Sequence, residues 1–203
     1  MKNTIFIVNI EEENKKGRNE PYRLGVSSWK KWAIKNNCEV FVLTERVYPE
    51  EYMNANWHKS LALQLLDDNN IKYDQVLIVD ADTIVHPDCP NFFEDTENKF
   101  CAVMNDGCYE WVTRSIQKYG DYLFPGIDIR TWEYFNSGFI VVNKSHREFF
   151  DKVINYYVEN VDKFIHAKSF YVGNDQTPLN YFVKKFGVDV KLLPGCYNLQ
   201  DMP

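Results

Sequence analysis

The stretch Gln75-Val-Leu-Ile-Val-Asp-Ala-Asp82 decides the fold class of this chain. The run over 75–79, rich in Val, Leu and Ile, predicts a buried strand, and two aspartates, Asp80 and Asp82, follow it directly. A continuous apolar strand is typical of a parallel sheet that is covered by helices on both faces. In such sheets ligands bind at the carboxyl ends of the strands. The stretch therefore predicts an α/β fold and the edge of the sheet where a site is expected.

Strand and helix patterns alternate along the chain before this stretch. Apolar runs predict strands over 4–10 and 39–43, and a charged loop over 11–20 follows the first strand. A helix is predicted over 21–37, because its apolar residues recur about three and four positions apart, namely Leu24, Val26, Trp29, Trp32, Ala33 and Ile34. A second helix is predicted from Trp57, Leu61, Leu65 and Leu66. These alternations predict a mostly parallel central sheet flanked by helices.

Further elements are predicted after the acidic pair. Strands are expected over 100–105, 138–143 and 188–193, and residues 119–130, which contain two glycines and a proline, indicate a long connection. Ser145 and Glu148 have the spacing of a capping box before another helix. A last helix is expected over 176–185, with Pro178 in its first turn. Because no linker or repeat interrupts the pattern, residues 1–203 are predicted to form a single Rossmann-like domain.

Composition and charge exclude several classes of protein. The chain is 45% hydrophobic and 26% charged, which suffices for a packed core, and its formal net charge is −6 with scattered Lys and Arg. This argues against binding to nucleic acid or to an anionic membrane surface. The apolar run over 5–10 is too short for a membrane span, and three glutamates follow it in place of the small-residue cleavage site of a signal peptide. Five cysteines without a CxxC pair indicate a reducing, cytoplasmic setting rather than a disulfide framework.

The acidic pair itself indicates a cation site. Residues two positions apart in an extended chain point to the same side, so the carboxylates of Asp80 and Asp82 repel each other unless a divalent cation such as Mg or Mn binds between them. The cation could also bridge to a diphosphate. The sequence has neither of the phosphate-binding loop patterns GxxxxGK[ST] and GxGxxG, so the cation is the remaining candidate for binding a diphosphate. Two alternatives remain. The aspartates could cap the next turn, or Asp80 could be the nucleophile of a haloacid-dehalogenase-type phosphatase, although 173–176 lacks that family's second acidic cluster.

Five short segments carry a family resemblance. They are Trp57-His-Lys59-Ser, Val79-Asp-Ala-Asp-Thr83, Phe135-Asn-Ser-Gly-Phe139, Gly173-Asn-Asp-Gln-Thr-Pro-Leu-Asn180 and Leu193-Pro-Gly-Cys-Tyr-Asn198. In this order and spacing they resemble the landmarks of GT-A nucleotide-sugar glycosyltransferases, particularly the glycogenin-like family 8 and related retaining families. The resemblance implies the GT-A fold and the metal-dependent transfer of a sugar from a UDP-sugar to a hydroxyl of a glycan or glycoprotein acceptor, with retention of configuration.

The same resemblance implies roles for individual residues. Asp80 and Asp82 would hold Mn or Mg on the donor diphosphate, and Asp175 with Gln176 would lie beside the reacting sugar as catalytic residues. Donor-binding residues would be Val8 and Asn9 at the base, Lys59, Asp80 and Ala81 along the nucleotide, and Asn136, Ser137 and Gly138 around the sugar. Structural alternatives are an exposed Lys59 on its helix, a Gly138 needed only by its turn, and an Asp175 that caps the last helix.

The sequence also departs from the family. After the last landmark, glycogenin-like enzymes supply a histidine as third metal ligand and then a lysine near the diphosphate, and this chain has neither before Pro203. We expect either water and the donor to complete the metal site, or the 203 residues to be the catalytic domain of a longer protein. A nucleotide-sugar-binding domain without turnover is an alternative function. Aromatic candidates for stacking on sugar rings are Tyr109, Trp111, Tyr122, Phe124, Trp132 and Tyr134.

Overall fold

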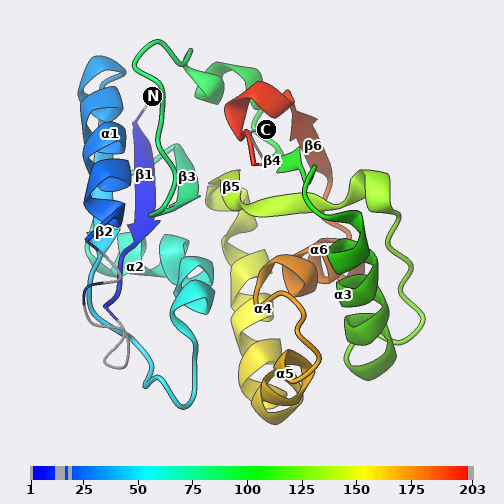
Figure 1. The fold of residues 1–203 in the computed structure, drawn as a ribbon. Helices are drawn as coiled ribbons and strands as arrows, with labels where there is room; N and C mark the ends of the chain where they lie inside the picture. Colours follow the sequence, from blue (N-terminus) through cyan, green and yellow to red (C-terminus); the bar gives the residue numbers. More distant parts are fainter. Residues whose placement is uncertain (1, 12–16, 18–19, 201–203) are drawn as a thin grey trace.

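A computed structural model of the protein describes residues 2–11, 17 and 20–200. Its centre is a sheet with the strand order β2-β1-β3-β5-β4-β6 (Figure 1). The strands are β1 (Asn3–Val8), β2 (Cys38–Leu43), β3 (Gln75–Asp80), β4 (Phe100–Met104), β5 (Phe135–Asn143) and β6 (Val190–Leu193). β1 pairs in parallel with β2 and β3, and β4 with β6, whereas β5 is antiparallel to both of its neighbours. The predicted α/β class with a mostly parallel sheet is confirmed. Most of the predicted 11–20 loop lies outside the described residues.

Helices cover both faces of this sheet. They are α1 (Tyr22–Lys35), α2 (Ala62–Asp68), α3 (Tyr109–Tyr122), α4 (Arg147–Glu159), α5 (Val161–Lys168) and α6 (Gln176–Lys185), with 3-10 turns η2 (Ala55–Leu61), η3 (Phe92–Asp95), η4 (Thr131–Glu133), η5 (Lys144–His146) and η6 (Gly195–Tyr197). One face packs against α1 and η3, and the other against η2, α2 and the helices α3 to α6 (Figure 1). Ile5 and Ile7 face the first layer and Phe6 the second, because side chains alternate along a strand.

The pairing of β3 with β5 positions the site. Val79 is the register partner of Phe139, so the carboxyl end of β3 meets the amino end of β5. Residues 136–138 therefore lie beside Asp80, although more than fifty positions separate them in the sequence. The strand β5 begins at Phe135, three residues earlier than predicted, because the backbone of Phe135 is paired to the buried Asn180 side chain through its N–H at 2.9 Å and its carbonyl at 2.9 Å.

The predicted connection over 119–130 is wrong in its first part. Residues up to Tyr122 belong to α3, whose buried side carries Val112, Ser115 and Tyr119. Gly120 does not interrupt this helix. A Cβ at position 120 would lie 2.7 Å from the hydroxyl oxygen of Tyr181, so this glycine permits the close approach of α3 and α6.

Other boundaries also differ from the predictions. The capping box before α4 is formed by Asn143 and His146, because Ser145 follows the cap and donates its N–H to Asn143 Oδ1 at 2.9 Å. The second predicted helix starts as the 3-10 turn η2, and Leu24 and Ile34 of α1 are exposed rather than part of the core. Among the residues that the structure describes, no helix is both long and apolar enough to cross a lipid bilayer.

Candidate functional site

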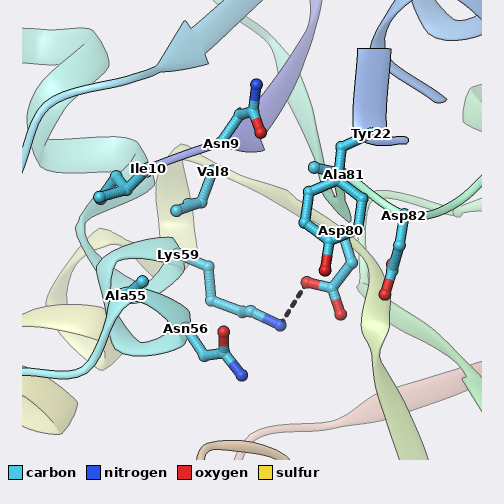
Figure 2. Close-up of a pocket in the computed structure, with 10 residues that line it drawn as sticks. All are labelled: Val8, Asn9, Ile10, Tyr22, Ala55, Asn56, Lys59, Asp80, Ala81 and Asp82. Atoms are coloured by element: carbon cyan, nitrogen blue, oxygen red, sulfur yellow. Dashed lines mark hydrogen bonds and ion pairs between the residues drawn. The ribbon is translucent and has the colours of Figure 1, made fainter. Parts of the chain in front are cut away.

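Two cavities lie on either side of the acidic pair. The first, here called the β1 cavity, is lined by Val8, Asn9, Ile10, Tyr22, Ala55, Asn56, Lys59, Asp80, Ala81 and Asp82 (Figure 2). The second, here called the C-terminal cavity, encloses about 840 Å³. Its walls include Trp29, both aspartates, Asn136, Gly138 and the segment 196–200. The predicted residues at the ends of β1 and β3 and at the start of β5 thus lie in one continuous region.

Lys59 lies at the bottom of this region. Its side chain is only 6% exposed, and its Nζ lies 2.7 Å from Asp80 Oδ1, 3.0 Å from Asp175 Oδ2 and 3.2 Å from the carbonyl oxygen of Ser137. Burial alone would lower the pKa of the ammonium, but the charges of Asp175 and Asp80 outweigh it and raise the pKa above its ordinary value. The alternative of an exposed Lys59 is therefore wrong, because the side chain neutralises two buried or half-buried carboxylates.

Asp175 is held by its side chain rather than by a helix cap. It occupies the N-cap position of α6 but makes no capping hydrogen bond, so the capping alternative is wrong. Its Oδ2 instead accepts a hydrogen bond from Ser137 Oγ at 2.9 Å, besides the ion pair with Lys59. Gln176 Oε1 accepts the N–H of Ser137 at 3.2 Å. Both residues predicted to be catalytic are thereby tied to the start of β5.

Asp80 and Gly138 fit together closely. A Cβ built on Gly138 would lie 2.9 Å from Asp80 Oδ2 and 2.8 Å from Asn136 Oδ1, so any other residue would push these side chains apart. The side chain of Asp80 remains 41% exposed toward the cavities. Its pKa is raised by the surrounding protein atoms and by the charges of Asp175 and Asp82, against the effect of Lys59. Gly138 thus leaves room for one carboxylate oxygen that Lys59 does not contact.

Asp82 contrasts with Asp80, because no hydrogen bond or ion pair joins its carboxylate to another residue in the described part of the chain. It is exposed, and Figure 2 shows its carboxylate beside that of Asp80 among the residues that line the β1 cavity. Oxygen ligands of this kind suit Mg or Mn. Within 2–11, 17 and 20–200, no group of three His, Cys, Asp or Glu residues is placed to hold a metal. The two carboxylates therefore fit a cation that takes its other ligands from water or from a bound phosphate.

Amide side chains form the wall between β5 and the C-terminal segment. Asn136 Oδ1 accepts hydrogen bonds from the N–H of Gly138 at 2.7 Å and from Asn198 Nδ2 at 3.2 Å, and Asn136 Nδ2 donates to Gln200 Oε1 at 3.2 Å. Gln176 Nε2 donates to Asn105 Oδ1 at 3.0 Å. Sequence reasoning missed Asn105 and Gln200, because nothing in their neighbourhood forms a motif. Asn198 could have been found, since it ends the last landmark.

The aromatic candidates divide into two groups. Phe124 and Tyr134 are core residues with 1% and 0% exposure, so their predicted role as stacking platforms is wrong. Tyr134 instead shares a 2.7 Å hydrogen bond with Thr177 inside the second layer. Tyr109, Tyr122 and Trp132 are exposed, and half-buried Trp111 packs against the backbone of Gly173. The exposed members remain candidates for contact with a substrate.

Comparison with known proteins finds similarity of structure and not of sequence. No model of a protein family matches the chain, and no curated protein matches it. A glycosyltransferase involved in the glycosylation of the major capsid of PBCV-1 superposes with a TM-score of 0.52 and 13% identity, over 77% of this chain and 66% of that one. Mouse xyloside xylosyltransferase 1, in its apo form, gives a TM-score of 0.53 and 11% identity over 96% of this chain and 86% of that one. The chain therefore has the α/β, GT-A-like fold of these glycosyltransferases.

Proposed function

We propose that this protein transfers a sugar from a nucleoside diphosphate, with UDP as the expected nucleotide, to a hydroxyl of a glycan or glycoprotein. One observation carries the proposal. A buried lysine joins Asp80, at the end of β3, to Asp175, at the start of α6, in a region bounded by two cavities. In this arrangement Lys59 holds both carboxylates in place, so that Asp80 could bind a cation while Asp175 lies near the reacting sugar. The fold around them is shared with glycosyltransferases.

Asp80 and Asp82 are the residues that would hold a divalent cation. Their oxygens are hard ligands, and the close approach of Gly138 to Asp80 Oδ2 leaves that oxygen in a space without a Cβ. When bound, such a cation would supply Lewis-acid stabilisation of the negative charge on the departing diphosphate. Lys59 has three N–H groups directed at three protein acceptors, so it acts as the counter-ion of the acids rather than as a ligand of the phosphates.

The remaining residues bind and orient the donor. Val8, Asn9 and Ala81 line the β1 cavity, where they would contact the base and ribose. Asn136, Ser137 and Gly138 would surround the sugar, and Asp175, fixed by Ser137 Oγ, would steady the positive charge that develops at the anomeric carbon. The resemblance of 173–180 to retaining glycosyltransferases supports the proposal of transfer with retention of configuration. A cytoplasmic setting stays a prediction.

The alternatives make different demands. A phosphatase would use Asp80 as a nucleophile, but one of its oxygens is bound to Lys59 and the fold is that of glycosyltransferases. A binding domain without turnover would keep nucleotide affinity and release no sugar. We therefore favour transfer, and turnover itself distinguishes it from binding.

The test is calorimetric titration of UDP with and without Mn, followed by product analysis with several UDP-sugars. We expect UDP to bind only when Mn is present. The combined substitutions Asp80→Asn and Asp82→Asn should abolish this Mn-dependent binding of UDP. Asp88→Asn, at the outer rim of the C-terminal cavity, is the matched control. UDP affinity that is unchanged by the double substitution would contradict the proposal.

A further inference from the structure

The acidic pair lies in a tight turn that follows β3. Residues Asp80-Ala-Asp-Thr83 form this turn, and it is closed by the N–H of Thr83, which donates to the carbonyl oxygen of Asp80 at 3.2 Å. Ala81 is buried, whereas Asp82 is exposed. Because no hydrogen bond or ion pair within 2–11, 17 and 20–200 holds the carboxylate of Asp82, the position of that carboxylate depends on the backbone of the turn.

The side chain of Thr83 connects this turn to α1. Its Oγ1 donates to the carbonyl oxygen of Asp80 at 2.7 Å and accepts the indole N–H of Trp29 at 2.9 Å. Trp29 is 3% exposed, and its ring packs against those of Phe92 and Phe139, with centroids 6.3 and 6.4 Å away, so the direction of its N–H is fixed. The hydroxyl is thus bound on both sides, and through it α1 fixes the carbonyl of the first aspartate.

The backbone of α1 approaches the same turn closely. A Cβ built on Gly25 would lie 2.3 Å from the carbonyl oxygen of Ala81 and 2.5 Å from that of Thr83. Both are backbone atoms, which cannot rotate away as the end of a side chain can. Nearby, Ser28 Oγ donates to the Gly25 carbonyl at 2.7 Å and accepts the N–H of Val85 at 3.1 Å. The helix therefore contacts the turn at its centre, at its end and just beyond it.

We propose that α1 positions the cation site, with Thr83 and Trp29 as positioning residues that act through the turn on Asp80 and Asp82. The inference rests on the proposed function and deepens it, because it assigns side chains that set the cation affinity of the acidic pair. Two neighbouring carboxylates repel each other without a cation, and a turn that is fixed to a helix keeps them from moving apart. Substitution of residues that orient metal ligands typically lowers metal affinity by about 10- to 100-fold.

The first test measures how much Mn is needed for UDP to bind. Calorimetry gives the UDP affinity at a series of Mn concentrations for the unmodified protein, Thr83→Val and Thr83→Ser. Valine keeps the size of the side chain but removes the hydroxyl, so about tenfold more Mn should be needed for half-maximal UDP affinity. At saturating Mn the UDP affinity of Thr83→Val should return close to that of the unmodified protein. Thr83→Ser keeps the hydroxyl and should need nearly as little Mn as the unmodified protein.

A matched pair of tryptophans on α1 separates positioning from stability. Trp32 is 2% exposed and donates its indole N–H to the carbonyl oxygen of Cys89 at 2.8 Å, outside the acidic turn. Trp29→Phe and Trp32→Phe each remove one buried indole hydrogen bond, so both should lower the urea midpoint to a similar extent. Only Trp29→Phe should raise the Mn requirement. An equal rise in both variants would assign the effect to the stability of the helix and overturn the inference.

Failure of the proposed function and failure of this inference are distinguishable. If UDP does not bind to the unmodified protein with Mn, the proposed function fails, and the inference is overturned with it. If UDP binds, and neither Thr83→Val nor Trp29→Phe needs more Mn than the unmodified protein, only the inference about α1 fails. Should Trp29→Phe fail to fold, Thr83→Val and Thr83→Ser decide the outcome by themselves.

Discussion

The floor of the candidate site and its rim differ in how their charges are compensated. On the floor, Lys59, Asp175 and Ser137 satisfy one another within a layer that is almost completely buried. On the rim, Asp82 is exposed and, among the described residues, has no hydrogen-bonding partner. The floor thus belongs to the folded structure itself, whereas the rim depends on a ligand for completion. Substitutions on the floor should affect stability and catalysis, and substitutions on the rim should affect binding.

The largest effect is expected from Lys59→Met. It leaves Asp175 buried without its counter-ion, and the removal of one partner from a buried ion pair costs about 3 to 5 kcal/mol. Because the side chain of Asp80 is 41% exposed, we expect the lower end of that range. Urea denaturation measures the change. Asp82→Asn on the rim is the control and should shift stability by less than about 0.5 kcal/mol. A loss as large in the control would remove the distinction between floor and rim.

Asp175→Asn should affect catalysis more than binding. The amide keeps nearly the same shape but removes the negative charge that the proposed function places beside the reacting sugar, so kcat should fall by about 100-fold, as for the loss of one preorganised electrostatic contact. The affinity for UDP should change little, because Asp175 does not line the β1 cavity. Steady-state kinetics and calorimetry together separate the two quantities. An unchanged kcat would show that Asp175 serves the fold alone.

Gly138→Ala tests the boundary between the two regions. The new methyl group would meet Asp80 Oδ2 and Asn136 Oδ1, which are ends of side chains that can rotate away. We expect a stability loss of only about 1 kcal/mol and a roughly tenfold lower Mn-dependent affinity for UDP. Gly195→Ala, where an added Cβ meets no atom within 4 Å, is the matched control. If both variants bind UDP equally, the space beside Asp80 has no role in the cation site.

The smallest effect is expected from Gln200→Ala at the rim. It removes the hydrogen bonds that connect Asn136 through Gln200 to β4. Each of these bonds contributes about 0.5 to 1.5 kcal/mol to stability. We expect a roughly threefold rise in KM for the sugar donor, with kcat and the affinity for UDP alone unchanged. A fall in kcat without a change in KM would contradict this expectation, because Gln200 would then act on catalysis, as the floor residues do, and not on binding.

The strands around the acidic pair could be predicted from the sequence, because each is a short apolar run whose burial requires no distant information. β1, β2 and β3 therefore appear near their expected positions. Asp80 and Asp82 follow from the same logic, since the end of a parallel strand is also a local feature. The family landmarks added 136–138, Asp175 and Gln176, which the structure brings together around Ser137.

What could not be predicted depends on pairs of distant residues. The burial of Lys59 requires both Asp80 and Asp175, which come from different elements, so the lysine by itself resembles an exposed helical cation. Gly120 resembles a helix breaker until the approach of Tyr181 is known. Phe124 and Tyr134 resemble loop aromatics by sequence, because the α6 residues that bury them, Tyr181, Phe182 and Thr177, are more than forty positions away.

The antiparallel register between β3 and β5 has a consequence for how such a protein can change. The ladder fixes Val79 opposite Phe139 whatever the length of the chain between them. Insertions or grafted loops in the exposed connections between Thr83 and Tyr134 can therefore alter the surface beside the site, while Asp80 and Gly138 keep their mutual distance. The exposed connections within 84–130 are therefore the places where insertions should be tolerated, whereas β4, which pairs with β5, and the buried side of α3 have to be kept.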